Sequence, residues 1–343
     1  MHCGAKAPTV ARIYGKRCRR CNGFKCAKVR ASVDDRTLHP DRGAVTFAAA
    51  MIVSASYRTD LPAFYADWFL ARLTAGECEV AHPFGGRPGR VDLRPGAVDG
   101  WVFWTRNLGS FGPALDRIGT RGEPFVVQFT ATGYPRALER SVIPPARAID
   151  QCRAIRDRFG PAVIVWRYDP IVVTEQMDGR WHGANFRRLA EGFAGIAVEV
   201  VVSFLAPYRK TRRNLDAAAA AGGFAWRLPP AEERQAILAD LAGAARAAGM
   251  TLTLCAQPEH VSTPLPAARC VDAARLARVA GRPIVARTRG NRPGCLCAES
   301  RDIGAYDSCP HGCAYCYAVV SRSVAQRRHR DHLSQAAMLG ATR

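Results

Sequence analysis

Short apolar runs that alternate with helical segments are the feature of this 343-residue chain that most restricts its fold. The runs are rich in Val, Ile, Phe and Trp, as buried parallel strands are. After an opening strand at Met51, they cover residues 101–104, 125–129, 163–166, 198–204 and 250–254. The intervening segments, such as 146–159, 186–193 and 231–248, have the spacing of amphipathic helices. These units predict an α/β fold, either a full or partial TIM-like β/α barrel or a doubly wound sheet.

Polar side chains follow several of the predicted strands, and this favours the barrel. In β/α barrels the loops after the strands form the rim where catalysis takes place. The alternative is that these residues cap the helices that follow. The candidate catalytic or substrate-positioning residues are Arg58, Asp60, Arg106, Asn107, Arg167 and Asp169.

Three cysteines near the C-terminus, Cys309, Cys313 and Cys316, follow the spacing C-x3-C-x2-C. Three thiolates on one tight loop can ligate three irons of a four-iron, four-sulfur cluster and leave the fourth iron open. Pro310 and Gly312 allow the backbone to wrap closely. The alternative is a zinc site, for which His311 or an upstream cysteine would supply the fourth ligand.

An aromatic residue, Tyr315, precedes the last of these cysteines. The segment therefore matches C-x3-C-x-φ-C, the signature of radical S-adenosylmethionine enzymes, in which φ is aromatic. The resemblance implies that Tyr315 shields the cluster or flanks the adenine. It also implies an electron donor such as a ferredoxin or flavodoxin, and a 5′-deoxyadenosyl radical that abstracts hydrogen from a substrate, which the sequence does not identify.

Residues 51–318 as a whole resemble the bacterial domain-of-unknown-function 1848 family. The resemblance rests on residues 54–60, 103–107 and 167–170 and on the segment Cys-Pro-His-Gly-Cys-Ala-Tyr-Cys-Tyr-Ala at 309–318. That family is uncharacterised and has a C-terminal cysteine cluster similar to that of radical S-adenosylmethionine proteins. The resemblance therefore identifies related proteins but does not identify a reaction.

The position of the cysteine triplet differs from that in ordinary radical S-adenosylmethionine proteins, which carry it after the first strand. A circularly permuted barrel would account for this difference, because the termini of a barrel can meet. In that interpretation residues 284–287 form the strand before the cluster loop, and residues 319–333 form the helix after it. No Gly-Gly-Glu strand end is present to hold the amino group of S-adenosylmethionine, so a cluster without this cofactor stays an alternative.

Four further cysteines precede the triplet, and together they supply enough thiolates for a second four-iron, four-sulfur cluster. Isolated cysteines are often buried as small apolar residues, which is what we expect of Cys78 and Cys152. The C-x-C pair is harder to explain by packing. The four candidate ligands are Cys255, Cys270, Cys295 and Cys297. We expect a domain of residues 51–343, whose cluster loop at 295–318 contains Cys295, Cys297 and the triplet.

Residues 1–50 carry 11 Lys or Arg and 3 Asp, a net charge of +8, and no sustained hydrophobic period. We expect a disordered basic extension, or a start codon assigned too far upstream. Its cysteines Cys18, Cys21 and Cys26 lack an evident fourth zinc ligand. No apolar stretch is long enough for a membrane span or a secretory signal, so the expected location is the cytoplasm.

Two non-catalytic functions stay open. The formal charge of +20 and the basic segment 327–330 are compatible with an iron-sulfur redox protein that binds nucleic acid, although basic helices are usually just solvated. The second non-catalytic alternative is a zinc-stabilised domain. His82 and His182 have no companion at ligand spacing, and we predict them to be surface or loop residues.

Overall fold

A seven-stranded parallel sheet forms the centre of the structure, a computed structural model that describes residues 51–82, 86–262 and 264–341. Its strands lie in the spatial order β10-β8-β6-β5-β4-β1-β11. They are β1 (Ile52–Ala55), β4 (Gly100–Thr105), β5 (Phe125–Thr130), β6 (Ile164–Ile171), β8 (Glu199–Phe204), β10 (Thr251–Leu254) and β11 (Arg301–Asp302). The expected α/β fold with parallel strands is confirmed. The predicted extension 1–50, with Cys18, Cys21 and Cys26, lies outside the described residues.

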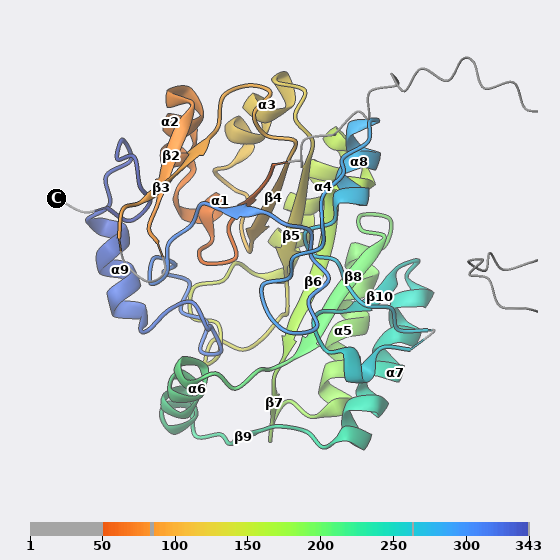
Figure 1. Cartoon of the computed structure of the whole chain (residues 1–343). Helices are drawn as coiled ribbons and strands as arrows, with labels where there is room; N and C mark the ends of the chain where they lie inside the picture. The colour runs from red at the N-terminus through yellow and green to blue at the C-terminus, as the bar shows by residue number, and fades with distance from the viewer. Residues whose placement is uncertain (1–50, 83–85, 263, 342–343) are drawn as a thin grey trace, which may run out of the picture. The chain divides into compact units, whose positions relative to one another are not determined.

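Helices connect the strands (Figure 1). They are α1 (Leu61–Phe64), α2 (Ala66–Ala75), α3 (Gly112–Thr120), α4 (Pro145–Phe159), α5 (Gly179–Phe193), α6 (Arg209–Gly222), α7 (Ala231–Ala247), α8 (Ala273–Ala280) and α9 (Arg322–Arg330). Short 3-10 turns occur at Pro161–Val163 and Pro258–His260. Two small antiparallel ribbons pair β2 (Glu77–Val80) with β3 (Gly89–Asp92) and β7 (Val173–Thr174) with β9 (Trp226–Arg227). The helices expected at 146–159, 186–193 and 231–248 correspond to α4, α5 and α7.

Side chains that alternate along the strands divide the core in two. Val53, Phe103 and Val127 belong to a large apolar cluster together with side chains from α2, α3, α4, α5 and α7. Their sequence neighbours Val102 and Val126 belong to a smaller cluster. Because successive residues of a strand point to opposite faces, the two clusters lie on opposite faces of the sheet. Most of the helices therefore cover one face.

The smaller cluster is formed largely by the segment around α8. A Cβ atom on Gly100 would lie 2.8 Å from Cδ1 of Leu276, so α8 packs tightly against the first residue of β4. Arg275 of α8 pairs with Glu199, the first residue of β8. Helix α8 therefore covers the amino ends of these strands and leaves the carboxyl ends to other segments.

The strand predicted at 284–287 is wrong, because these residues form no strand in the structure. Instead β11 precedes the cysteine loop and pairs in parallel with β1, with Asp302 opposite Ser54. A two-residue strand leaves too short a hydrophobic pattern to be recognised in the sequence. The helix expected at 319–333 is confirmed in its central part, since α9 begins after the N-cap Ser321.

The end of the chain packs on the first helices, as Figure 1 shows beside α2 and the β2–β3 ribbon. Trp68 Nε1 donates to the Ala336 carbonyl at 2.9 Å, and Arg72 Nη2 donates to the Gln335 carbonyl at 2.9 Å. These contacts fix the segment after α9 to α2.

Candidate functional site

A cavity of about 490 Å³ lies where the carboxyl ends of the strands converge. The loop after β1, the ends of β4 and β5 and the distal part of β6 contribute to its wall. Parallel sheets bind ligands at this end because the strand-to-helix loops meet there. Both groups of predicted ligands and five of the six polar candidates line the cavity, namely Cys309, Cys313, Cys316, Cys255, Cys270, Cys295, Cys297, Arg58, Asp60, Arg106, Arg167 and Asp169.

Asn107 is the polar candidate that does not line this cavity. Its Oδ1 accepts hydrogen bonds from the Gly109 backbone at 3.0 Å and from Gln151 Nε2 at 2.8 Å. These contacts hold the loop after β4 on α4. Asn107 therefore has a local structural role, but it does not cap the following helix as the alternative proposed, because the N-cap of α3 is Phe111.

The cysteine triplet lies on the loop that runs from β11 to α9. Gly312 has a φ of 75°, and a Cβ atom there would lie 2.6 Å from Arg322 Cδ, so the turn requires glycine. Within the loop, the Cys316 backbone donates to the Cys313 carbonyl at 3.2 Å. Burial raises the pKa of all three thiols, that of Cys313 to about 12. A metal would have to displace these protons, as metals do when thiolates bind them.

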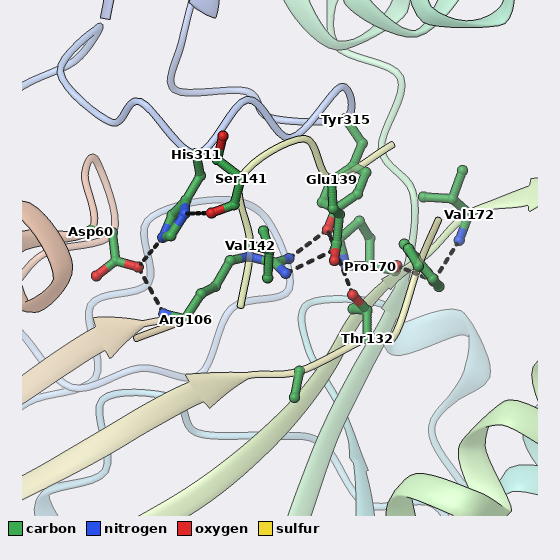
Figure 2. A network of polar contacts seen from close by, with 12 residues as sticks. Asp60, Arg106, Thr132, Glu139, Ser141, Val142, Pro170, Val172, His311 and Tyr315 are labelled. Atoms are coloured by element: carbon green, nitrogen blue, oxygen red, sulfur yellow. Dashed lines mark hydrogen bonds and ion pairs between the residues drawn. The ribbon is translucent and has the colours of Figure 1, made fainter. Parts of the chain in front are cut away.

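A buried carboxylate, Asp60, fastens this loop to the rim. Its Oδ2 lies 2.7 Å from His311 Nε2 and accepts the Arg106 backbone N–H at 2.7 Å (Figure 2). Its Oδ1 accepts from Thr105 Oγ1 at 2.7 Å and from the Ala63 backbone at 3.1 Å, which caps α1. Asp60 therefore positions the cysteine loop against β4 as well as lining the cavity.

The same contacts show how His311 is used. Its Nε2 is bonded to Asp60, and its Nδ1 lies 3.3 Å from the Ser141 carbonyl. Both ring nitrogens therefore have partners away from the thiols. A zinc site that used His311 as its fourth ligand would have to break the contact with Asp60.

A second buried network supports the loop from the side of β5, as Figure 2 shows. Arg106 Nη1 donates to Glu139 Oε1 at 2.8 Å, and its Nη2 donates to the Tyr315 hydroxyl at 2.5 Å. Tyr315 in turn donates to Glu139, which also accepts from Thr132 Oγ1 at 2.5 Å. Although burial opposes a charge here, the Glu139 carboxylate raises the pKa of the Arg106 guanidinium, which stays charged.

Asp302, the last residue of β11, does not line the cavity but holds two residues that do, Ser56 and Arg58, and sequence reasoning missed it. It accepts hydrogen bonds from Ser56 Oγ at 2.8 Å and from the Gly304 backbone at 2.9 Å, and it lies 3.6 Å from Arg58 Nε. Glu139 was missed as well. No local pattern marks either residue, since their partners are far away in the sequence. Recognising β11 as a strand would have drawn attention to Asp302.

Comparison with known protein families identifies the family of this chain. The family model described as a domain of unknown function (DUF1848) matches residues 52–318. The chain belongs to this family. The match ends at Ala318, so the matched DUF1848 region contains all seven cavity cysteines together with β1 to β11. No curated protein and no solved structure matches the chain.

Among the described residues of this DUF1848 protein, no group of three or more His, Cys, Asp or Glu side chains is arranged to hold a metal ion. The donor set nevertheless suits iron and sulfur. Cys309, Cys313 and Cys316 line one cavity, the neighbouring His311 is bonded to Asp60, and thiolates are the usual ligands of iron-sulfur clusters. Three thiolates fit a cubane cluster whose fourth iron is open.

The prediction that His182 is a surface or loop residue is wrong. His182 lies on α5 and is fully buried. Its Nε2 is 3.0 Å from the Val172 carbonyl and its Nδ1 is 2.8 Å from the Tyr168 hydroxyl. Its spacing of four and seven residues from Phe186 and Leu189, on the buried face of α5, is the signal that could have indicated burial. Cys78 and Cys152 are buried, as expected.

One finding bears on a membrane. In the part of the chain that the structure describes, no helix is both long and apolar enough to cross a bilayer.

Proposed function

We propose that this protein binds a four-iron, four-sulfur cluster through Cys309, Cys313 and Cys316 and that S-adenosylmethionine occupies the open iron. The observation that carries the proposal is the position of the three thiols on one cavity wall, while both nitrogens of the neighbouring His311 are engaged elsewhere. When bound and reduced by one electron, such a cluster cleaves S-adenosylmethionine to methionine and a 5′-deoxyadenosyl radical. An electron donor of the ferredoxin or flavodoxin type supplies that electron.

The strand order supports a circularly permuted, partial β/α barrel. If β11 is counted as the first strand, the spatial order β11, β1, β4, β5, β6, β8 and β10 is also the order of these strands along the chain. The loop between β11 and α9 then has the position of the first strand-to-helix loop, where radical S-adenosylmethionine proteins carry their triplet. In the described residues β10 and β11 are the edges of the sheet, so the proposal is an open barrel.

The residues of the cavity have distinct roles in this proposal. Asp60 and Arg106 hold the cysteine loop, directly and through Tyr315, so that the thiols stay in place. Arg58 binds an anionic group. Its guanidinium lies 5.6 Å from the ring centre of Tyr57 and 5.3 Å from that of Tyr306, and its buried Nε makes no hydrogen bond within the described residues. A carboxylate in the cavity would satisfy this donor.

Water exclusion is the other task of the cavity wall. Trp104, Tyr306, Tyr317 and Phe204 line it. Aromatic walls of this kind lower the local dielectric constant and protect a reactive intermediate from solvent. The substrate would lie among these rings and the charged groups of β6, Arg167 and Asp169.

Anaerobic purification and reconstitution test the proposal. The loaded protein is expected to be brown, to absorb at about 400 nm, and to lose about four irons per chain when Cys313 is changed to Ala. With a strong reductant it is expected to convert S-adenosylmethionine to 5′-deoxyadenosine. Zinc in place of iron would refute the cluster. A cluster without cleavage would refute the enzyme and leave a redox or nucleic-acid-binding protein.

A further inference from the structure

Four cysteines from three separate segments meet at a second place on the cavity wall. Cys255 directly follows β10, Cys270 lies before α8, and Cys295 and Cys297 belong to the loop that leads to β11. These thiols belong to or pack against the smaller apolar cluster, on the sheet face opposite most of the helices. The C-terminal triplet reaches the cavity from the β11 edge. The two groups of thiols therefore come from different elements.

Two of the four thiols are in direct contact, and all four line the same cavity. Cys270 Sγ lies 3.7 Å from Cys255 Sγ, although 15 residues separate them in the sequence. Burial of isolated cysteines as small apolar residues does not by itself bring thiols into contact. Cys152 illustrates that ordinary case, because it is fully buried on α4 and only desolvation by burial shifts its pKa.

Hydrogen-bond donors surround these sulfurs. Arg167 Nη1 lies 3.0 Å from Cys270 Sγ, and Arg292 Nη2 lies 3.4 Å from Cys255 Sγ. The Val271 backbone N–H is 3.3 Å from Cys297 Sγ. Two buried or half-buried guanidinium groups would stabilise neutral thiols only weakly. The same groups would stabilise thiolates and the negative charge of a ligated cluster much more strongly.

We propose that Cys255, Cys270, Cys295 and Cys297 hold a second four-iron, four-sulfur cluster, which assembles independently of the first. All four ligands are protein thiolates, so this cluster has no open iron. The proposal goes beyond the function assigned to the C-terminal triplet and does not depend on it.

The arrangement favours a cluster over a single zinc ion. With zinc-sulfur bonds of about 2.3 Å, four thiolates around one ion lie about 3.8 Å from each other in every pair. The Cys270–Cys255 pair has this spacing, 3.7 Å, but no group of three or more side chains in the described residues is arranged around one metal ion. A cubane spreads its ligands over four corners, and the shared cavity of about 490 Å³ has room for it.

Metal counting on four proteins tests the proposal. These are the wild type, the variant C309A/C313A/C316A, the variant C255A/C270A/C295A/C297A and the control C78A/C152A, each reconstituted anaerobically and analysed for iron, sulfide and zinc. The expected irons per chain are about eight, about four, about four and about eight. Retention of the full wild-type iron content by the quadruple variant would overturn the proposal, as would zinc that disappears with these four cysteines.

The same counts separate this proposal from the one on the triplet. If only the quadruple variant loses iron, the second cluster stands and the first fails. If only the triplet variant loses iron, the second fails. The second cluster also fails if the wild type holds only about four irons per chain and the quadruple variant keeps them. Where the triplet binds its cluster, the irons that the quadruple variant keeps also show that this variant is folded.

A variant that keeps every cysteine provides a second measurement. Arg292→Gln removes the donor to Cys255 Sγ, and loss of a hydrogen bond to a ligating sulfur lowers the midpoint potential of that cluster. We expect a wild-type iron count and a lower potential, with an altered electron paramagnetic resonance signal, for one of the two clusters. The control is Arg289→Gln on the same loop, whose side chain is exposed and pairs with Glu299. Identical potentials in wild type and Arg292→Gln would count against the proposal.

Discussion

Asp60 Oδ2 and His311 Nε2 lie 2.7 Å apart, although 251 residues separate the two side chains in the sequence. The contact joins the loop after β1 to the loop that carries the cysteine triplet. It is buried, and it is continued on the Asp60 side by Arg106 and Thr105. The position of the proposed cluster therefore depends on a residue at the opposite end of the domain sequence.

Changing Asp60 to Asn should weaken this loop. Both carboxylate oxygens accept hydrogen bonds, two each, whereas an amide has only one accepting oxygen. We expect the free energy of unfolding to fall by about 1 to 3 kcal/mol and the iron content after reconstitution to fall with it. Thermal unfolding and iron analysis measure both. Asp67→Asn, on the exposed face of α2, is the control. Unchanged iron in Asp60→Asn would show that the contact does not position the triplet.

Arg106 and Glu139 should behave as a coupled pair. Replacing Arg106 by Met leaves the Glu139 carboxylate buried without its cation, which should cost about 3 to 5 kcal/mol of unfolding free energy. The double variant R106M/E139Q should recover a large part of that loss, because no uncompensated charge is left. Denaturant unfolding of the wild type, both single variants and the double variant gives the coupling. Additive losses would contradict it.

Arg58 and Asn107 provide a matched comparison of residues that line and do not line the cavity. Arg58→Gln removes a cation that lines the cavity, where it pairs with Asp302 but has no hydrogen bond at Nε, so we expect the loaded protein to bind S-adenosylmethionine about tenfold more weakly, with its iron retained. Asn107→Ala should leave that affinity unchanged and lower only the stability, through the lost contact with Gln151. Equilibrium binding measures the affinity. Equal affinities in the two variants would refute the role of Arg58.

His182 should make the stability depend on pH. Burial lowers its pKa to about 4, whereas an unfolded chain has a value of about 6.5. The folded protein therefore resists protonation of His182, and stability is full above about pH 6.5. It should fall by about 3 kcal/mol in total as the pH is lowered through that value toward 4. Unfolding free energies between these pH values should show this slope in the wild type and a smaller one in His182→Gln. Equal slopes would assign the effect to other groups.

The sequence predicted the architecture better than the site. Trp101, Val126 and Val201 lie in runs of apolar residues, which are the local signature of buried parallel strands, and the structure has a strand at each of them. The short strand β11 has no such run, so its position was mistaken for 284–287. His182 was misjudged because it was considered as an isolated ligand rather than as part of the buried face of α5.

The sequence alone determined the family, the parallel α/β fold and the identity of the sulfur ligands proposed here, because spacing within one loop and apolar periodicity are local properties. Only the tertiary structure brought Cys255 beside Cys270 and joined Arg167 to both Cys270 and Asp169. Likewise, Asp60, Glu139 and Asp302 acquired their roles through partners in distant segments. These contacts depend on which strands are neighbours in the sheet, and that order is set by packing of the whole chain rather than by any single stretch of it.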